Sequence, residues 1–304
     1  VGSEMCIRDS VKGIFNTTNL ALKKFGPKRV VETPVSENAL TGIQLGMSLL
    51  GKKPILMHAR VDFSLLGFDQ LINNASKWHY MFGGKTKSPS ITIRVIVGKG
   101  WGQGPTHSQN FQSLLAHIPG LKVVSPAFPE DAYNLLIESI FDPNPVIFLE
   151  NEILYGQSFE VPDLKDYTVP IGKARVWREG DDITLVSFGI GMKYALEAAD
   201  QLEKMGISTE VIDLRSLRPL DTETVINSVK KTNRCVTVEE GYPVCSIGNY
   251  VSSVLMQHAF DYLDAPVINC SGKDVPMPYA ANLEKLALVT TKDVLTAAKA
   301  VLYR

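Results

Sequence analysis

The sequence predicts an α/β protein with two domains, each a parallel β-sheet in a three-layer arrangement with helices. Short β-branched runs alternate with segments of helical periodicity in 30–150 and again in 183–304, and this alternation predicts parallel βαβ units. The periodicity fades between the two halves, where Pro, Gly and charged residues dominate. The chain has 304 residues, about twice the usual length of one domain. We therefore expect domains at 11–152 and 181–304, joined by a linker at 153–180.

In the first half, apolar residues from Ala39 to Leu50 have helical spacing and stop at Gly51, a typical C-terminal signal. The segment from Phe63 to Met81 has one apolar face and is expected to form one long helix. The other expected elements are strands ending at Val31 and covering Pro54–His58, Ser90–Val97, Leu121–Pro126 and Pro145–Glu150, and a helix at Glu130–Phe141.

The second half repeats the alternation and is long enough to bury a core of its own. The expected strands are Ile183–Phe188, Ser208–Leu214, Arg234–Glu239 and Ala265–Cys270. The expected helices are Met192–Met205, Thr222–Lys231, Ile247–Phe260 and one that begins near Lys292.

Residues 1–10 do not continue this pattern. They lack the basic start and continuous apolar core of a signal peptide. The run from Met5 to Ser10 resembles translated sequencing-library adapter, so we interpret 1–10 as a non-native segment. On that interpretation the first domain is truncated at its start.

Composition and charge exclude several classes of function. Apolar residues make up 45% of the chain and charged residues 21%, as is ordinary for a globular protein. The formal net charge of −1 gives no electrostatic case for nucleic acid or an anionic membrane as a partner. No apolar run approaches the roughly 20 residues of a membrane-spanning helix. The four cysteines form no Cys-x-x-Cys pair and no metal-ligand spacing, so we expect structural thiols in a reducing cytosol.

Glu37 is the most informative single residue. Val30 and Val31 end a strand, Pro34 keeps the preceding residue extended, and Ser36 is a suitable N-cap. Glu37 then lies in the first turn of a helix, where the helix dipole favours a carboxylate. The dipole alone explains an isolated Glu, so a catalytic role depends on the rest of the chain.

A glycine-rich loop at 98–108 follows a strand and precedes a helix, at the edge of a parallel sheet where ligands bind. It contains neither a Gly-x-Gly-x-x-Gly fingerprint nor a P-loop. His107 ends this loop and is a candidate acid or base, because histidine titrates near neutrality. A surface histidine that caps the next helix explains the same pattern, and spacing alone does not decide between the two.

The other histidines form no spacing suited to a metal. We interpret His79, His117 and His258 as structural and leave His58 open, because it ends a strand at the presumed active edge. By its pattern alone, Phe63 is a core residue or a hydrophobic staple.

Several ordered runs carry a family resemblance. They are Lys24–Pro34, Glu37 with Gly42, Phe63-Ser64, Phe68–Gln70, His107–Gln109, Pro119–Pro126, Leu149–Glu152, Asp213–Pro219, Lys231–Asn233, Val236–Gly241 and Gly272–Tyr279. Together they resemble the β subunits of the decarboxylating component of 2-oxo acid dehydrogenase complexes, and most closely those of pyruvate dehydrogenase. The resemblance covers about 11–304, with a transketolase-like pyrimidine-binding domain followed by a transketolase C-terminal domain.

The resemblance implies thiamine diphosphate chemistry in an active site shared with an α subunit. The α subunit is expected to hold Mg²⁺ and the diphosphate, and this sequence has no Gly-Asp-Gly motif for that ion. Glu37 matches the family's catalytic glutamate, which hydrogen-bonds to the pyrimidine ring. Phe63 matches the aromatic contact to the pyrimidine, and Val35 lies in the same pocket by position. His107 matches the histidine that assists reductive acylation of a lipoyl group.

The resemblance also implies partners and a second ion. The expected assembly has two α and two β subunits and docks on a lipoyl-bearing acyltransferase core. A structural potassium site would involve the backbone near Ile140 and Asp142, together with Asn144. The C-terminal half is implied to pack the assembly and to help dock the acyltransferase core, rather than to carry acid–base chemistry. Asp274–Tyr279 is interpreted as a structural turn.

Two departures from the family leave the substrate open. The loop Gly98–Gly104 replaces a Pro-Asn-Gly-Ala type loop, and His58 and Arg60 replace less basic residues. Pyruvate is the expected 2-oxo acid. The alternatives are a branched-chain 2-oxo acid or acetoin dehydrogenase β subunit, and a fragment of a transketolase-like or deoxyxylulose-phosphate-synthase-like enzyme.

A non-catalytic assembly subunit is the alternative from another class. The retained Glu37, Phe63 and His107 argue against it. The expected location is the cytoplasm of a bacterium, or a mitochondrial matrix if the source is eukaryotic.

Overall fold

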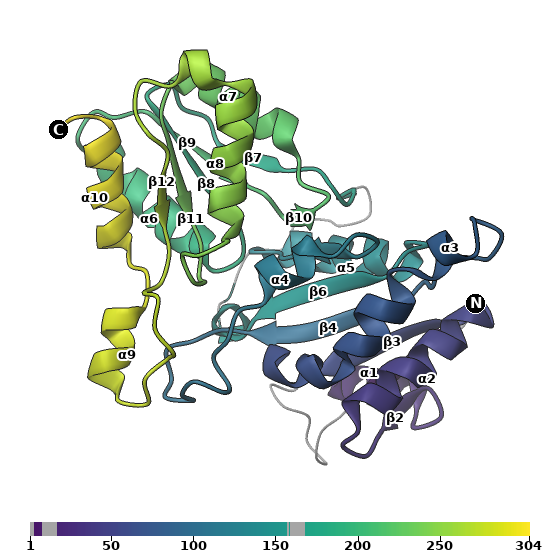
Figure 1. Ribbon diagram of the computed structural model, residues 1–304. Helices are drawn as coiled ribbons and strands as arrows, with labels where there is room; N and C mark the ends of the chain where they lie inside the picture. The colour runs from purple at the N-terminus through teal and green to yellow at the C-terminus, as the bar shows by residue number, and fades with distance from the viewer. Residues whose placement is uncertain (1–2, 8–16, 157, 159–167) are drawn as a thin grey trace. The chain divides into compact units, whose positions relative to one another are not determined.

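The structure, a computed structural model, describes residues 3–7, 17–156, 158 and 168–304. Contacts divide the chain into two compact units. Unit 1 comprises Val1–Val97, Leu114–Val124 and Pro129–Ile171, and unit 2 comprises Gly98–Ser113, Ser125–Phe128 and Gly172–Arg304. Each unit contains a sheet of mostly parallel strands with helices, which confirms the predicted α/β class (Figure 1).

Unit 1 is built on strands in the order β5-β6-β4-β3-β1-β2, and every described pair among them is parallel. These strands are β1 (Ser3–Ile7), β2 (Val30–Glu32), β3 (Lys53–His58), β4 (Thr92–Val97), β5 (Lys122–Val124) and β6 (Val146–Asn151). The α-helices of the first half are α1 (Asn19–Phe25), α2 (Glu37–Leu49), α3 (Trp78–Met81), α4 (Gln112–His117) and α5 (Pro129–Phe141).

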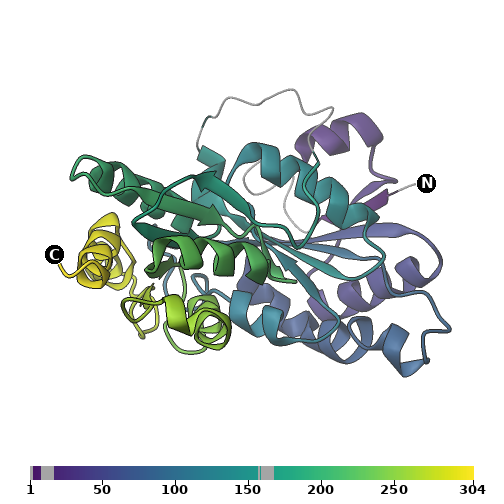
Figure 2. The same cartoon turned by 90° about the horizontal axis from the view of Figure 1, so that it is seen from above.

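The centre of this sheet is buried on both faces. Every residue of β4 and β6 is buried, as expected for parallel strands covered by helices on each side. Helix α2 packs against β3, while α5 packs against β3 and β6. Figure 2 shows helices of this unit on both sides of the sheet.

The segment predicted to be non-native contributes a strand. β1 lies between β2 and β3, with Met5 opposite Val30 on one side and Ile55 on the other. Residues 1–2 and 8–10 of the segment lie outside the described residues. The origin of 1–10 stays a prediction.

The long helix predicted from Phe63 to Met81 is wrong. The chain instead forms a 3₁₀ segment η2 (Val61–Gly67), a π-helical segment η3 (Asp69–Ala75) and the short α3. Gly67 explains part of the interruption, because a Cβ atom there would lie only 2.6 Å from Thr41 Oγ1 in α2. The 3₁₀ segment η2 packs against α2.

Unit 2 has strands in the order β12-β11-β8-β9-β7. Their bounds are β7 (Arg175–Arg178), β8 (Ile183–Ser187), β9 (Thr209–Asp213), β11 (Cys235–Val238) and β12 (Ile268–Cys270), and the chain also forms β10 (Ser216–Arg218). The helices are α6 (Gly191–Glu203), α7 (Thr222–Thr232), α8 (Ile247–His258), α9 (Ala281–Ala287) and α10 (Thr291–Val301), and short 3₁₀ segments are η4 (Glu152–Gly156, in unit 1) and η5 (Phe260–Tyr262). Helices α6 and α10 pack on each other and on the sheet, as do α7 and α8, which gives three layers.

Three elements of the second half were not predicted from the sequence. Strand β7 pairs antiparallel with β9, so this sheet is mixed rather than fully parallel. β7 also lies inside the segment 153–180 that was expected to be irregular linker, of which residues 157 and 159–167 are outside the described part. The short β10 and α9 carry too few residues for a periodic signal. In the described residues, no helix combines the length and the hydropathy that a bilayer crossing requires.

Candidate functional site

Glu37 opens α2 in unit 1. Ser36 occupies the N-cap position as predicted, but its side chain makes no capping hydrogen bond. The Glu37 side chain is 3% exposed, which is rare for a carboxylate in the first turn of a helix. Thr41 Oγ1 donates to the Glu37 carbonyl at 2.7 Å and holds this first turn in place. The start of α2 therefore carries a buried carboxylate. A favourable interaction with the helix dipole would not by itself require this burial.

Phe63 lies on η2, which packs against α2. The contact is close at Gly67, where an added Cβ would lie 3.5 Å from the Glu37 carbonyl oxygen. Phe63 is partly exposed, and Val35 is 67% exposed. Unit 1 thus brings together the elements that carry Glu37 and Phe63, and the side chains of Phe63 and Val35 are accessible.

Sequence reasoning missed a group of buried charges on β4, on β6 and just after β3. Arg94 makes a two-pronged contact with Glu150, at 2.6 Å from Nε and 2.8 Å from Nη2. The Tyr155 hydroxyl also donates to Glu150. Burial and the neighbouring Glu150 raise the pKa of Tyr155, so this hydroxyl stays protonated and keeps its donor role.

A register argument could have found this pair. Arg94 lies opposite Phe148, and Glu150, two residues further along β6, points to the same face of the sheet. Opposite charges inside two strands that otherwise look buried therefore signal an internal ion pair.

Arg60 forms a second buried ion pair in the same unit. Its Nη1 contacts Glu152, and its Nε lies 3.9 Å from Asp62. His58, which the sequence left open, is 2% exposed at the end of β3. The two basic residues that depart from the family pattern are therefore interior groups, and Arg60 borders the η2 segment that carries Phe63.

His107 belongs to unit 2. Its ring Nδ1 lies 3.1 Å from the Thr106 hydroxyl, and its backbone N–H donates to the Gly104 carbonyl at 3.4 Å. The side chain is partly exposed, whereas the adjacent Ser108 is fully buried. His107 is thus presented at the surface of a loop whose next residue is fixed in the interior.

The predicted potassium ligands lie near the end of α5. The Asp142 carboxylate forms an ion pair with Lys122 and accepts hydrogen bonds from the Asn144 backbone and side-chain nitrogens. The Asp142 carbonyl accepts a hydrogen bond from Ser90 at 2.6 Å. Lys122 already neutralises the Asp142 carboxylate, so a potassium ion here would depend on backbone carbonyl groups, and the site stays a prediction.

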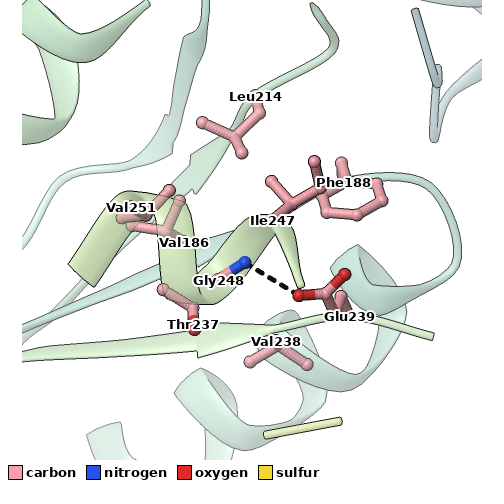
Figure 3. Close-up of a pocket in the computed structure, with 9 residues that line it drawn as sticks. All are labelled: Val186, Phe188, Leu214, Thr237, Val238, Glu239, Ile247, Gly248 and Val251. Atoms are coloured by element: carbon pink, nitrogen blue, oxygen red, sulfur yellow. Dashed lines mark hydrogen bonds between the residues drawn. The ribbon is translucent and has the colours of Figure 1, made fainter. Parts of the chain in front are cut away.

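Unit 2 also contains a small cavity between β8, β11 and α8, lined mostly by apolar side chains (Figure 3). It has room for about one water molecule and is too small for an organic cofactor. Glu239 lies at its edge and accepts a hydrogen bond from the Gly248 backbone at 2.8 Å. Burial raises the pKa of the Glu239 carboxyl.

The cysteines fit the structural interpretation. Burial raises the pKa of both Cys235 and Cys270 to about 12, so these thiols are poor nucleophiles. Cys245 is exposed and, like the other two, free. Among the described residues, no cluster of His, Cys, Asp and Glu is arranged to hold a metal ion.

Comparison with known proteins decides the family. Residues 5–157 match the family described as "Transketolase, pyrimidine binding domain", and residues 172–294 match "Transketolase, C-terminal domain". The pyruvate dehydrogenase E1 component subunit beta of Rickettsia felis is 48% identical to this chain, over 96% of the chain and 89% of the relative. The chain belongs to the family of pyruvate dehydrogenase E1 component β subunits.

Other members of this family show the same relationship. The Rhizobium meliloti subunit beta is 54% identical over 96% of this chain, which spans 64% of that relative's length. The mitochondrial subunit beta of Dictyostelium discoideum is 45% identical, over 96% of the chain and 83% of the relative. A solved structure titled "Split gene transketolase, inactive beta4 tetramer" superposes with a TM-score of 0.82 at 27% identity, covering 99% of this chain and 92% of that one.

The residues of unit 1 fit the cofactor that this family implies, thiamine diphosphate. An aminopyrimidine ring needs a carboxyl group near a ring nitrogen and an apolar surface against its face. The buried carboxyl of Glu37 and the aromatic ring of Phe63 come from two elements that pack on each other, and they match these needs.

Proposed function

We propose that this chain is the β subunit of a thiamine-diphosphate-dependent 2-oxo acid dehydrogenase that acts on pyruvate and passes the acyl group to a lipoyl group. The observation that carries the proposal is the buried Glu37 carboxylate at the start of α2, beside the η2 segment that carries Phe63. When bound, thiamine diphosphate supplies the nucleophilic carbon and the electron sink for loss of CO₂.

The roles of the chain's own residues follow from this placement. Glu37 exchanges a proton with a pyrimidine ring nitrogen, and its burial keeps water away from that exchange. Phe63 offers an aromatic face to the ring, a contact that contributes about 1 kcal/mol. Val35 contributes apolar surface to the same pocket. His107, on its partly exposed loop, donates a proton during acyl transfer to the lipoyl group.

The proposal includes the partners. An α subunit supplies the diphosphate and Mg²⁺ grip, two of each subunit assemble, and a lipoyl-bearing acyltransferase core receives the acyl group. A potassium ion near Ile140, Asp142 and Asn144 would be structural. The bacterial relatives favour the cytoplasm of a bacterium as the location.

The identities favour a pyruvate dehydrogenase over the transketolase-like alternative. The curated relatives named for pyruvate dehydrogenase are 45–54% identical, whereas the split-gene transketolase is 27% identical. Coexpression with the α-subunit gene tests the assignment, followed by assays of the decarboxylation of pyruvate and branched-chain 2-oxo acids and of the cleavage of acetoin, which has no carboxyl group to lose. We expect pyruvate to give the highest kcat/KM. Preference for another substrate would select an alternative, and an inactive but assembled complex would favour the non-catalytic role.

The isolated chain should not bind thiamine diphosphate tightly. The diphosphate anchor, which we assign to the α subunit, should contribute most of the cofactor affinity. The split-gene transketolase described above is titled an inactive β4 tetramer, which is consistent with an active site that needs both kinds of subunit. Calorimetry on the chain alone should detect no submicromolar, Mg²⁺-dependent binding, and detection of such binding would contradict a shared site.

A further inference from the structure

The loop that carries His107 is held by a carboxylate from the far end of the chain. Glu284, in α9, is 2% exposed. Its Oε1 accepts a hydrogen bond from the Gly100 backbone N–H at 3.0 Å, and its Oε2 accepts one from the Gly102 N–H at 3.1 Å. Gly100 and Gly102 have φ angles of +108° and +77°, which lets both amides point at one carboxylate as in an anion-binding nest.

Lys99 and Gly104, which flank the two glycines bound by Glu284, make further contacts within unit 2. Lys99 Nζ lies 4.5 Å from the centre of the Tyr242 ring. Gly104, at φ +73°, leaves no room for a side chain, because a Cβ would lie 2.2 Å from the Tyr279 ring. The run Asp274–Tyr279, interpreted from sequence as a structural turn, therefore also contacts the loop.

The far end of the loop is held by Gln112, which is 3% exposed. Its side-chain nitrogen donates to the Glu240 carbonyl at 3.0 Å and lies 3.4 Å from the buried Glu239 carboxylate. His107 lies between Gly104 and Gln112, and its backbone N–H donates to the Gly104 carbonyl. Its position therefore depends on the anchors before and after it.

We propose that Glu284 is a positioning residue for His107: by binding the amides of Gly100 and Gly102, it fixes the loop so that the imidazole meets the incoming lipoyl group. The chemical role of His107 rests on the proposed function, whereas the anchoring of the loop does not. The C-terminal half, expected from the family to pack the assembly and to help dock the acyltransferase core, then also positions a residue of the transfer step.

The anchor can be tested without activity, by hydrogen exchange on the whole chain. Two charge-assisted hydrogen bonds protect the Gly100 and Gly102 amides, so Glu284→Ala should speed exchange of a peptide covering 98–104 by about tenfold or more. Glu284→Gln should show a smaller increase, because its amide keeps one acceptor oxygen but turns a donor toward the second amide. Lys285→Ala, at an exposed position of the same helix, is the matched control and should leave the peptide unchanged.

Peptides from β8 and β11 should exchange at wild-type rates in these variants, which separates a released loop from an unfolded unit. If Glu284→Ala unfolds the unit, the exchange rate of peptide 98–104 in Glu284→Gln tests the anchor instead. Unchanged exchange of 98–104 in Glu284→Gln and in a folded Glu284→Ala would overturn the anchor.

The positioning role is tested in the complex assembled with the α subunit. Glu284→Gln should lower lipoyl reductive acylation about tenfold while decarboxylation with an artificial electron acceptor changes less. In a His107→Ala background the same substitution should cause no further loss, because both act through one imidazole. Equal losses in both assays, or additive losses in the double variant, would overturn the positioning role. A wild-type complex that decarboxylates no 2-oxo acid would instead contradict the proposed function and leave the exchange result standing.

Discussion

Glu37 and His107, the two residues proposed to transfer protons in the reaction, are held by different kinds of structure. Glu37 is the first residue of α2, fixed by the regular hydrogen bonds of a helix that packs on β3 and η2. His107 lies on a loop without regular structure. That loop contacts residues distant in sequence, chiefly Glu284 and Tyr279, and is held at its end by the hydrogen bond from Gln112 to Glu240. The first arrangement suits a group that must stay fixed against a buried ring. The second suits a group at the surface that meets an arriving partner.

The largest expected effect is at the helix-held site. Glu37→Gln should leave folding intact but slow overall turnover of the assembled complex about 100- to 10,000-fold, since an amide cannot exchange the proton. Steady-state rates with pyruvate measure this. Glu138→Gln, at an exposed position of α5, is the matched control. Near-normal turnover in Glu37→Gln would contradict the assigned role.

Substitution of the loop-held residue should separate two steps. His107→Ala should reduce acylation of a lipoyl domain about 100-fold, but reduce decarboxylation with an artificial electron acceptor by much less. The two assays on one preparation give the comparison directly, and His258→Ala, on the exposed end of α8, serves as control. Equal losses would show that His107 serves the first step or only supports the loop.

The contact between α2 and η2 should be sensitive to one methyl group. Gly67→Ala would place a Cβ 2.6 Å from Thr41 Oγ1, so we expect a loss of about 1–3 kcal/mol in unfolding free energy. Denaturant unfolding of the chain measures this loss. The double variant Gly67→Ala/Thr41→Ala should lose less than the sum of the single variants, because the second change removes the clashing oxygen. Additive losses would show that the contact is not the cause.

The smallest effect concerns Glu239, whose carboxylate accepts a hydrogen bond from the side chain of Gln112, at the end of the loop that carries His107. Burial raises the pKa of the folded carboxyl above its ordinary value of 4.5, so the folded chain keeps this proton to higher pH than the unfolded chain does. The contribution of Glu239 to the free energy of unfolding is fully present below the pKa that this carboxyl has in the unfolded chain. It is lost as pH rises through the pKa of the folded chain, by at most about 1.4 kcal/mol per pH unit.

Glu239→Gln has no such proton, so wild type should lose thermal stability relative to this variant as pH rises above 4.5. Thermal unfolding at a series of pH values measures the difference, with Glu223→Gln at an exposed position as control. Parallel curves for wild type and Glu239→Gln would contradict the expected linkage.

The sequence predicted the repeated elements well because their signal is local. β-Branched runs and helical spacing located β4, β6, α2 and α6 within a few residues of their bounds. The segment 61–81 was predicted wrongly because its interruption comes from the close approach of Gly67 to α2, which is a tertiary contact. Strand β7 was missed for a similar reason: it is a short edge strand whose pairing with β9 is decided by the sheet.

The site divides in the same way. Glu37, Phe63 and His107 were found because they lie in recognisable runs, although their assigned roles remain proposals. The buried Arg94–Glu150 pair and the Glu284 contact join residues far apart in the chain, and no single run carries a signal for them. Only the strand register could have indicated the first, and no sequence feature that we can name indicated the second.

The buried pair of Arg94 and Glu150 also limits how this chain can change over generations. Both side chains are less than a tenth exposed, and removal of one member of such a pair leaves a buried charge that costs about 3–5 kcal/mol. That is a large share of the roughly 5–15 kcal/mol that keeps a domain folded. A lineage can therefore exchange the pair for apolar residues only by passing through a poorly folded ancestor, or by changing both codons together. The two positions are expected to be inherited as a unit, even though neither is assigned a part in the chemistry.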